Sequence, residues 1–128
     1  MRTTFKAYER LKREQHIDTL FRTGKAFSFS PVRFLYIVVP RADAADAPVM
    51  AGFSVPKKKF RKSVHRHRIT RLLREAWRLH KHRIYTTLPP DKQIHLFIIY
   101  NSTEMPDYKT IEDAVVKGID FLGMRDKE

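Results

Sequence analysis

The sequence predicts a single α+β domain, an α/β sandwich in which a small mixed sheet of four strands packs against helices. Two observations predict this class. The patterned segments follow in the order α-β-β-β-α-β-α, with no repeat and no low-complexity linker between them. The 128 residues, of which 42% are hydrophobic, suffice for one core and leave no room for two. We therefore expect one domain over residues 1–128, with 1–8 as a flexible arm and 123–128 as a frayed tail.

The first predicted element is a helix over residues 11–23. Three apolar side chains recur there at the i, i+3, i+4 spacing of one helix face, namely Ile17, Leu20 and Phe21. Gly24 follows at a position where helices commonly end. Residues 25–30 alternate around two phenylalanines, which predicts a short strand before Pro31.

Residues 32–39 give the strongest strand pattern, because β-branched and aromatic residues fill the run. Both faces of this strand are apolar, so we expect both to be covered at least in part. A loop bounded by Pro40 and Pro48 follows. Residues 49–55 are predicted as the next strand and as the hairpin partner of 32–39.

The C-terminal half predicts a long helix, a strand and a final helix. The long helix covers about residues 63–84, before a break at 88–90, and the strand covers residues 93–100. The final helix opens near Pro106 and extends to about residue 122. It carries a continuous apolar stripe made of Tyr108, Ile111, Val115, Ile119 and Leu122.

The positive charge of the chain is concentrated in one segment. The formal net charge is +12, and residues 57–83 hold twelve of the 26 Lys and Arg residues but a single acid, Glu75. The other 101 residues hold 14 basic and 13 acidic groups. A charge that served only solubility would be scattered, so this segment favours an anion-binding surface over a merely solvated helix face. A polyanion is the expected kind of partner.

Composition also excludes several classes of protein. The chain has no cysteine, which excludes disulfide scaffolds, cysteine-based zinc sites and thiol nucleophiles. The sequence contains no run of 18 apolar residues, so a membrane-spanning helix is not expected. The N-terminus lacks the apolar region of a secretory signal. We therefore expect a cytoplasmic protein.

The long predicted helix is amphipathic. One side collects apolar residues, namely Ile69, Leu72, Leu73, Ala76 and Trp77, with His80 beside them. The opposite side collects cations at spacings of three and four, namely His67, Arg71, Arg74, Arg78 and Lys81. At about 1.5 Å per residue this stripe is roughly 20 Å long, which matches several phosphates of an RNA strand better than one small anion.

The start of this helix carries cations where stability favours acids. A helix N-terminus is equivalent to about half a positive charge, and each cation there is unfavourable by up to about 1 kcal/mol. The first turns nevertheless contain Arg66 and Arg68, and a basic run precedes them, namely Lys57, Lys58, Lys59, Arg61 and Lys62. The arrangement is explained if a phosphate supplies the missing anion, held by free N–H groups and guanidinium groups.

No catalytic or metal site is predicted. Two His-x-His pairs lie in the basic segment, namely His65 with His67 and His80 with His82. Such pairs point about 200° apart on a helix, whereas metal ligands need a spacing of three or four residues. The chain has four glycines and no Gly-rich phosphate loop, and no nucleophile or carboxylate pair stands at a catalytic spacing. We expect Glu75 and Glu112 to be structural or solvated.

Residues 62–75 have the sequence KSVHRHRITRLLRE and resemble the protein component of bacterial ribonuclease P. That family carries a basic helix of roughly the pattern K-x-A-V-x-R-N-R-x-K-R-x-x-R-E. Five residues match it, namely Arg66, Arg68, Arg71, Arg74 and Glu75. Three depart from it, because Ser63 replaces Ala, His67 replaces Asn and Thr70 replaces Lys. Weaker matches extend the resemblance over roughly residues 8–122.

The resemblance implies a fold like the second domain of ribosomal protein S5, with the basic helix as a left-handed crossover between parallel strands. It also implies a non-catalytic subunit of an endoribonuclease, in which a catalytic RNA uses Mg²⁺ to remove the 5′ leader from precursor tRNA. That RNA and the precursor tRNA are the expected partners. No protein partner, membrane or protein-bound cofactor is expected.

The resemblance further assigns site residues. The expected RNA contacts are Lys57, Lys58, Lys62, Arg66, His67, Arg68, Thr70, Arg71, Arg74 and Arg78. By position, the resemblance places Ile17, Phe21 and Tyr36 in a cleft between the first helix and the sheet that would hold the single-stranded leader. The alternation of the strand adds Phe34 to this cleft. Plain core packing is the alternative for these four residues.

Two other functions fit the charge distribution. A structural RNA-binding protein of ribosomal type would share the basic surface but would have no leader cleft. A DNA-binding module would also need cations, but the sequence shows no helix-turn-helix pair.

Overall fold

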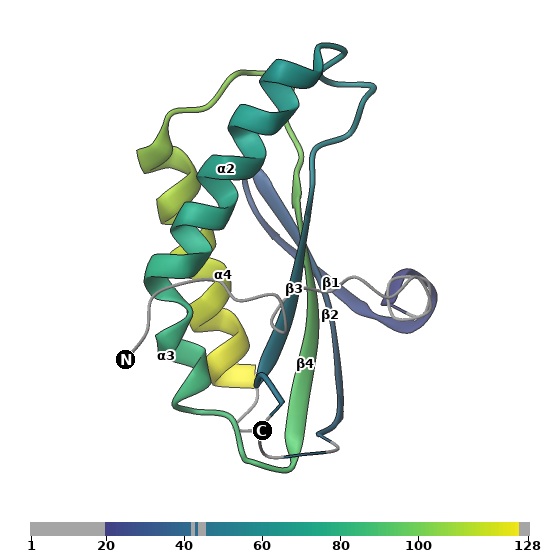
Figure 1. The fold of residues 1–128 in the computed structure, drawn as a ribbon, viewed down its shortest axis with the longest axis vertical. Helices are drawn as coiled ribbons and strands as arrows, with labels where there is room; N and C mark the ends of the chain where they lie inside the picture. The colour runs from purple at the N-terminus through teal and green to yellow at the C-terminus, as the bar shows by residue number, and fades with distance from the viewer. Residues whose placement is uncertain (1–19, 42, 44–45, 126–128) are drawn as a thin grey trace.

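The computed structural model describes residues 20–41, 43 and 46–125, and shows a four-stranded sheet with two long helices on one face (Figure 1). The strands are β1 (Lys25–Phe29), β2 (Val32–Pro40), β3 (Val49–Ser54) and β4 (Lys92–Tyr100). The helices are α2 (Ser63–His80), α3 (His82–Tyr85) and α4 (Tyr108–Arg125). Residues 20–23 are helical, as predicted for the end of the first helix, whereas residues 11–19 and the predicted arm at 1–8 lie outside the described residues.

The sheet has the strand order β1-β2-β4-β3. β1 pairs with β2 and β2 with β4 in antiparallel fashion, whereas β4 and β3 are parallel. The prediction that residues 49–55 form a hairpin with 32–39 is therefore wrong, because β4 lies between the two strands. β4 is apolar on both faces over most of its length, and such a strand gains most from the central position of a sheet.

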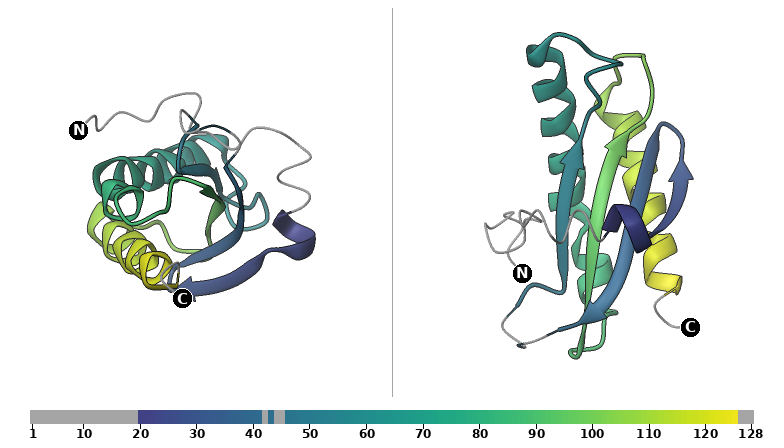
Figure 2. Two further views of the ribbon diagram at one scale, coloured as in Figure 1. Left: turned by 90° about the horizontal axis from the view of Figure 1, so that it is seen from below. Right: turned by 90° about the vertical axis from the view of Figure 1, so that its right-hand side faces the viewer.

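The parallel strands β3 and β4 are joined by a crossover that contains α2. In the right-hand view of Figure 2 the helices lie behind the sheet and the green β4 stands to the right of the teal β3, so the crossover is left-handed. About 98% of such connections are right-handed, so periodicity alone would not have predicted this hand. The crossover implied by the resemblance is confirmed.

The main core lies between the sheet and helices α2 and α4. Its largest fully buried side chains are Trp77, Tyr100 and Phe34. The stripe predicted for the last helix is buried in the core, with Ile111, Val115, Ile119 and Leu122. That helix continues to Arg125, so the predicted frayed tail begins too early, because a glycine such as Gly123 weakens a helix without ending it.

The opposite face of the sheet carries a smaller apolar cluster. Leu20 and Leu35 are buried there, and four partly exposed side chains pack against them, namely Ile37, Met50, Phe97 and Ile99. The expectation that both faces of β2 are covered at least in part is therefore confirmed. Only the face under α2 and α4 carries the main core.

Helix α4 lies close to the Phe34 ring of β2 at Gly118. A Cβ atom at this position would lie 2.6 Å from Phe34 Cε2. The Phe34 ring cannot easily move aside, because it stacks on Phe27 with ring centres 4.8 Å apart. Glycine is therefore required here by the close approach of the helix to the aromatic ring.

We predict that Gly118→Ala lowers the free energy of unfolding by about 1–3 kcal/mol, the usual cost of overpacking a core. Urea unfolding measures the change. Gly123→Ala is the matched control on the same helix, since its Cβ would meet Thr87 Oγ1 at an ordinary 3.8 Å. That variant should be more stable than the parent by up to about 1 kcal/mol. Equal effects at the two glycines would contradict the close contact.

A polar contact connects α2 to α4. His80 Nε2 lies 3.0 Å from Glu112 Oε2, and the Tyr108 hydroxyl donates to the same oxygen at 3.3 Å. The hydrogen bond with His80 lowers the pKa of Glu112, whereas burial and the charge of Glu112 raise the pKa of Tyr108 to about 12. Glu112 is therefore a structural residue, and His80 lies at the edge of the core as expected.

We predict that Glu112→Gln destabilises the protein at neutral pH and that the loss shrinks in acid. The folded-state pKa of Glu112 is depressed, so its stabilisation is present above the ordinary pKa of 4.5 and disappears as pH falls through the lower folded value. Urea unfolding between neutral pH and about pH 3 measures this difference. Asp113→Asn, which alters an exposed residue of the same helix, should change stability little at any pH. A loss for Glu112→Gln that is constant with pH would refute the assignment.

Candidate nucleic-acid interface

Helix α2 exposes cations on one side because its apolar side is buried. Ile69, Leu73, Ala76 and Trp77 are fully buried in the main core. On the other side three of the predicted cations are exposed, namely His67, Arg71 and Arg74, and Arg78 is half-buried. The predicted amphipathic helix is therefore confirmed up to Arg78.

Lys81 does not belong to the exposed stripe, contrary to the prediction. Its residue is only 4% exposed, and its Nζ lies 5.5 Å from the centre of the Tyr85 ring. The helix predicted over 63–84 is interrupted here, because α2 ends at His80 and α3 begins at His82. Lys81 keeps a helical backbone, with φ −58° and ψ −28°, and the aromatic face stabilises the buried cation.

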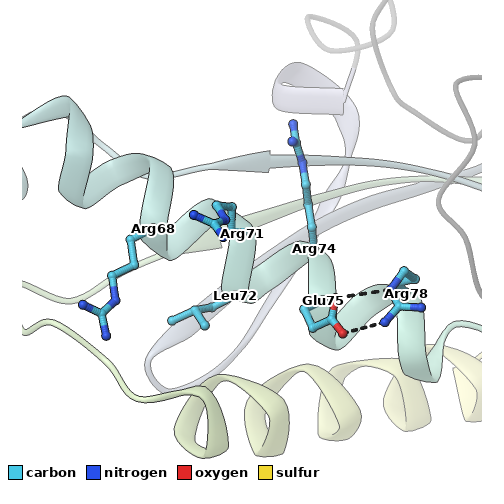
Figure 3. Close-up of a pocket in the computed structure, with 6 residues that line it drawn as sticks. All are labelled: Arg68, Arg71, Leu72, Arg74, Glu75 and Arg78. Atoms are coloured by element: carbon cyan, nitrogen blue, oxygen red, sulfur yellow. Dashed lines mark hydrogen bonds and ion pairs between the residues drawn. The ribbon is translucent and has the colours of Figure 1, made fainter.

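The exposed cations line an open hollow of about 680 Å³ along α2 (Figure 3). Its lining residues are Arg68, Arg71, Leu72, Arg74, Glu75 and Arg78. Figure 3 shows the side chains of Arg68 and Arg74 extending from the helix in opposite directions. Cations spread in this way suit an extended polyanion with several phosphates better than one small anion.

Two of these arginines are held by neighbouring side chains. Arg78 donates to Glu75 from Nε at 3.2 Å and from Nη2 at 2.5 Å, and this pairing lowers the pKa of Glu75. The guanidinium of Arg74 lies 5.9 Å from the centre of the Phe53 ring. Arg78 therefore adds less net charge to the surface than the sequence pattern alone suggests, and Glu75 is structural.

The connection before α2 is a compact structure, which we call the basic loop (residues 57–62). Four of its cations are exposed, namely Lys57, Lys58, Arg61 and Lys62. The Phe60 ring is buried beside Tyr100, with ring centres 6.0 Å apart. Lys59 Nζ donates a hydrogen bond of 2.8 Å to Asn101 Oδ1.

The start of α2 lacks the groups that usually stabilise a helix N-terminus. Within the described residues no side chain caps the helix at Lys62, and its first turn has no acid. Arg68 is exposed, whereas Thr70 and Arg66 are half-buried. Arg66 Nη1 donates to the carbonyl oxygens of Phe60 and Arg61, a structural role that helix periodicity does not reveal.

The predicted leader cleft does not form from the four residues assigned to it. Phe34 and Tyr36 are 0% and 6% exposed and lie in the main core. Phe21 is 55% exposed and contacts Phe97 on the opposite face, with ring centres 5.4 Å apart. Ile17 lies outside the described residues. The assignment of Phe34 and Tyr36 is wrong because a shift of one residue along a strand moves the side chain to the other face.

The side chains near Phe21 come from strand positions that alternate with those buried in the main core. We call this surface the outer face; it consists of Phe21, Leu35, Ile37, Met50, Phe97 and Ile99. The sequence held one signal for it. In β4 the positions of this face also include Gln93 and His95, whereas the alternate positions from Ile94 to Ile98 are wholly apolar. The less apolar set of a strand is the better candidate for the face without the main core.

Neither a metal-ligand cluster nor a membrane-spanning helix is present in the described ranges. In residues 20–41, 43 and 46–125 no group of three or more His, Cys, Asp or Glu side chains is placed to hold a metal ion. Over the same ranges, no helix has the length and apolar character needed to cross a membrane.

Comparison with known proteins identifies a family. The family model described as ribonuclease P matches residues 5–122. A ribonuclease P protein component from Porphyromonas gingivalis is 40% identical over 113 residues, which cover 87% of this chain and 80% of the relative. One from Clostridium botulinum is 32% identical over 118 residues, which cover 90% and 95%.

Solved structures show the same fold. The ribonuclease P protein of Staphylococcus aureus is 19% identical, with a TM-score of 0.68 over 91% of this chain and 96% of the other. The protein from Thermotoga maritima is also 19% identical, with a TM-score of 0.68 over 88% and 96%. The fold, the basic crossover helix and the family match together show that this chain belongs to the ribonuclease P protein family, as a subunit of the endoribonuclease that processes tRNA.

Proposed function

We propose that the subunit binds the RNA of ribonuclease P through the basic loop and α2, and that its outer face receives the 5′ leader of precursor tRNA. One observation carries the proposal. Residues 57–83 hold nearly all the excess charge, and burial of the apolar side of α2 holds this segment on one side of the domain. Most of its cations are exposed there. Such a surface binds RNA by neutralising phosphates and releasing counterions.

The outer face supports the part of the proposal that concerns the leader. Its side chains are apolar or aromatic and most are only partly buried, and Phe21 is the most exposed of them. Arg33 is exposed on the same set of β2 positions as Leu35, opposite Ile99 of β4. Aromatic rings with a nearby cation bind single-stranded RNA by stacking and by charge, without reading its sequence.

The chemistry is proposed to belong to the RNA. The sequence offers no nucleophile or acid–base constellation, so the protein would act by holding the RNA and the leader. The Mg²⁺ that the resemblance implies for cleavage would be bound by RNA phosphates, the oxygen ligands this ion usually takes in phosphate chemistry.

We predict that the affinity for the ribonuclease P RNA falls steeply with salt and that Arg71→Ala makes the fall shallower. Each phosphate contact contributes about 0.7–0.9 to the slope of log affinity against log salt, so this variant should lose about that amount. Filter binding across a salt series measures the slope.

The control is the double variant Glu75→Gln, Arg78→Ala, which removes a paired acid and base and leaves the net charge unchanged. Its slope should stay close to that of the parent. A flat salt dependence of the parent protein would contradict the proposed interface.

We predict that Phe21→Ala weakens binding of leader-bearing precursor tRNA to the assembled enzyme by about 1–3 kcal/mol, the value of stacking one base. Binding of mature tRNA should hardly change. Val38→Ala is the control, since this apolar side chain is 43% exposed but lies outside the outer face. Equal losses for precursor and mature tRNA would rule out a leader contact at Phe21. That result would also favour a structural RNA-binding role.

A further inference from the structure

The basic loop is fastened to the rest of the domain at three points. Arg66 Nη1 donates to the carbonyl oxygen of Phe60 at 2.8 Å and to that of Arg61 at 2.9 Å. The Phe60 side chain is buried in the main core. Lys59 Nζ donates to Asn101 Oδ1 at 2.8 Å, which connects the loop to the end of β4.

These contacts oppose a strong tendency of the loop to open. Five of its six residues are cations, and like charges so close together repel one another. Its internal backbone bonds are few, with the N–H groups of Lys59 and Phe60 both directed at the Pro56 carbonyl at 3.1 and 3.3 Å. A guanidinium that bonds two successive carbonyls therefore contributes much of the order in this loop, because hydrogen bonds from charged donors are the stronger kind.

We propose that Arg66 is a positioning residue, whose guanidinium holds the basic loop in the shape that presents Lys57, Lys58 and Arg61 to RNA. The inference rests on the proposed RNA interface and deepens it. Part of the effect of Arg66 on RNA binding passes through the loop cations, which are ordered before RNA arrives. Ordering them in advance lowers the conformational entropy that binding must remove.

The first test uses the full-length protein without RNA and compares Arg66→Lys with Arg68→Lys. Both variants keep the charge, but the lysine ammonium is one bond shorter than a guanidinium Nη and lacks its planar fork. Hydrogen exchange of the Lys59 and Phe60 amides should become at least about tenfold faster in Arg66→Lys, as expected for the loss of bonds from a charged donor. It should stay unchanged in Arg68→Lys. Unchanged exchange in both variants overturns the proposal.

The second test is a double-mutant cycle on binding to the ribonuclease P RNA. Arg66→Lys should weaken binding about tenfold in the parent, but less than about twofold when Lys57 and Lys58 are both alanine. Arg68→Lys should have the same effect in both backgrounds. A strictly additive loss for Arg66→Lys would mean that Arg66 acts only by touching RNA, and the proposal would be withdrawn.

Two outcomes need separate handling. If Arg66→Lys does not fold, Arg66→Gln is compared with Arg68→Gln instead, because both changes remove one charge and only the first removes the guanidinium bonds to the loop. Faster exchange of the loop amides in Arg66→Gln alone then supports the proposal, and equal exchange in the two variants overturns it. If the parent protein shows no salt-dependent RNA binding, the proposed interface fails, while the exchange experiment still decides whether Arg66 orders the loop.

Discussion

The parallel pairing of β3 with β4 is the constraint on which the rest of the structure depends. Parallel neighbours cannot be joined by a tight turn and need a crossover of about a dozen residues or more. Here the crossover includes the basic loop and α2, so the most highly charged segment of the chain must pass over the sheet. It can do so only because Ile69, Leu73 and Trp77 bury one side of the helix. The same burial sets the rotation of α2 and therefore the direction in which Arg71 points.

The two faces of the interior strand β4 contribute to two functional layers of the molecule. One set of β4 positions, with Ile94, Leu96 and Ile98, builds the main core under α2 and α4, and the other set, with Phe97 and Ile99, contributes to the outer face. Most of the apolar burial lies in the first layer. The second can therefore leave aromatic surface partly exposed, which a soluble domain otherwise avoids. The two surfaces proposed to meet RNA thus depend on the opposite faces of one sheet.

Local patterns in the sequence predict the helices and strands well but do not predict their long-range partners. The strands and α2 form where periodicity places them, since alternation and helical spacing act over a few residues. The hairpin expected between 32–39 and 49–55 fails because pairing depends on β4, some forty residues further on. Phe34 and Tyr36 lie on the face opposite to the predicted one. Both sets of β2 positions are apolar from Phe34 to Val39, and the packing of α4 against Phe34 selects the set that is buried in the main core. The burial of Lys81 depends on its contact with the Tyr85 ring, and the position of the Arg66 guanidinium depends on its bonds to loop carbonyls. No rule of residue spacing predicts either contact.

The crowding of cations before and within α2 connects stability to function. A helix that begins without a cap or an acid, next to a loop of like charges, is less stable by itself than the same helix with ordinary ends. The apolar side of α2 offsets this loss, and Arg66 partly neutralises the exposed loop carbonyls while it adds a further cation. In the proposed interface a bound polyanion would remove the repulsion and occupy the helix N-terminus, and it would then stabilise the folded state by mass action. The free protein therefore holds its repelling charges in an ordered arrangement, which the proposed RNA interface would neutralise without rebuilding the surface.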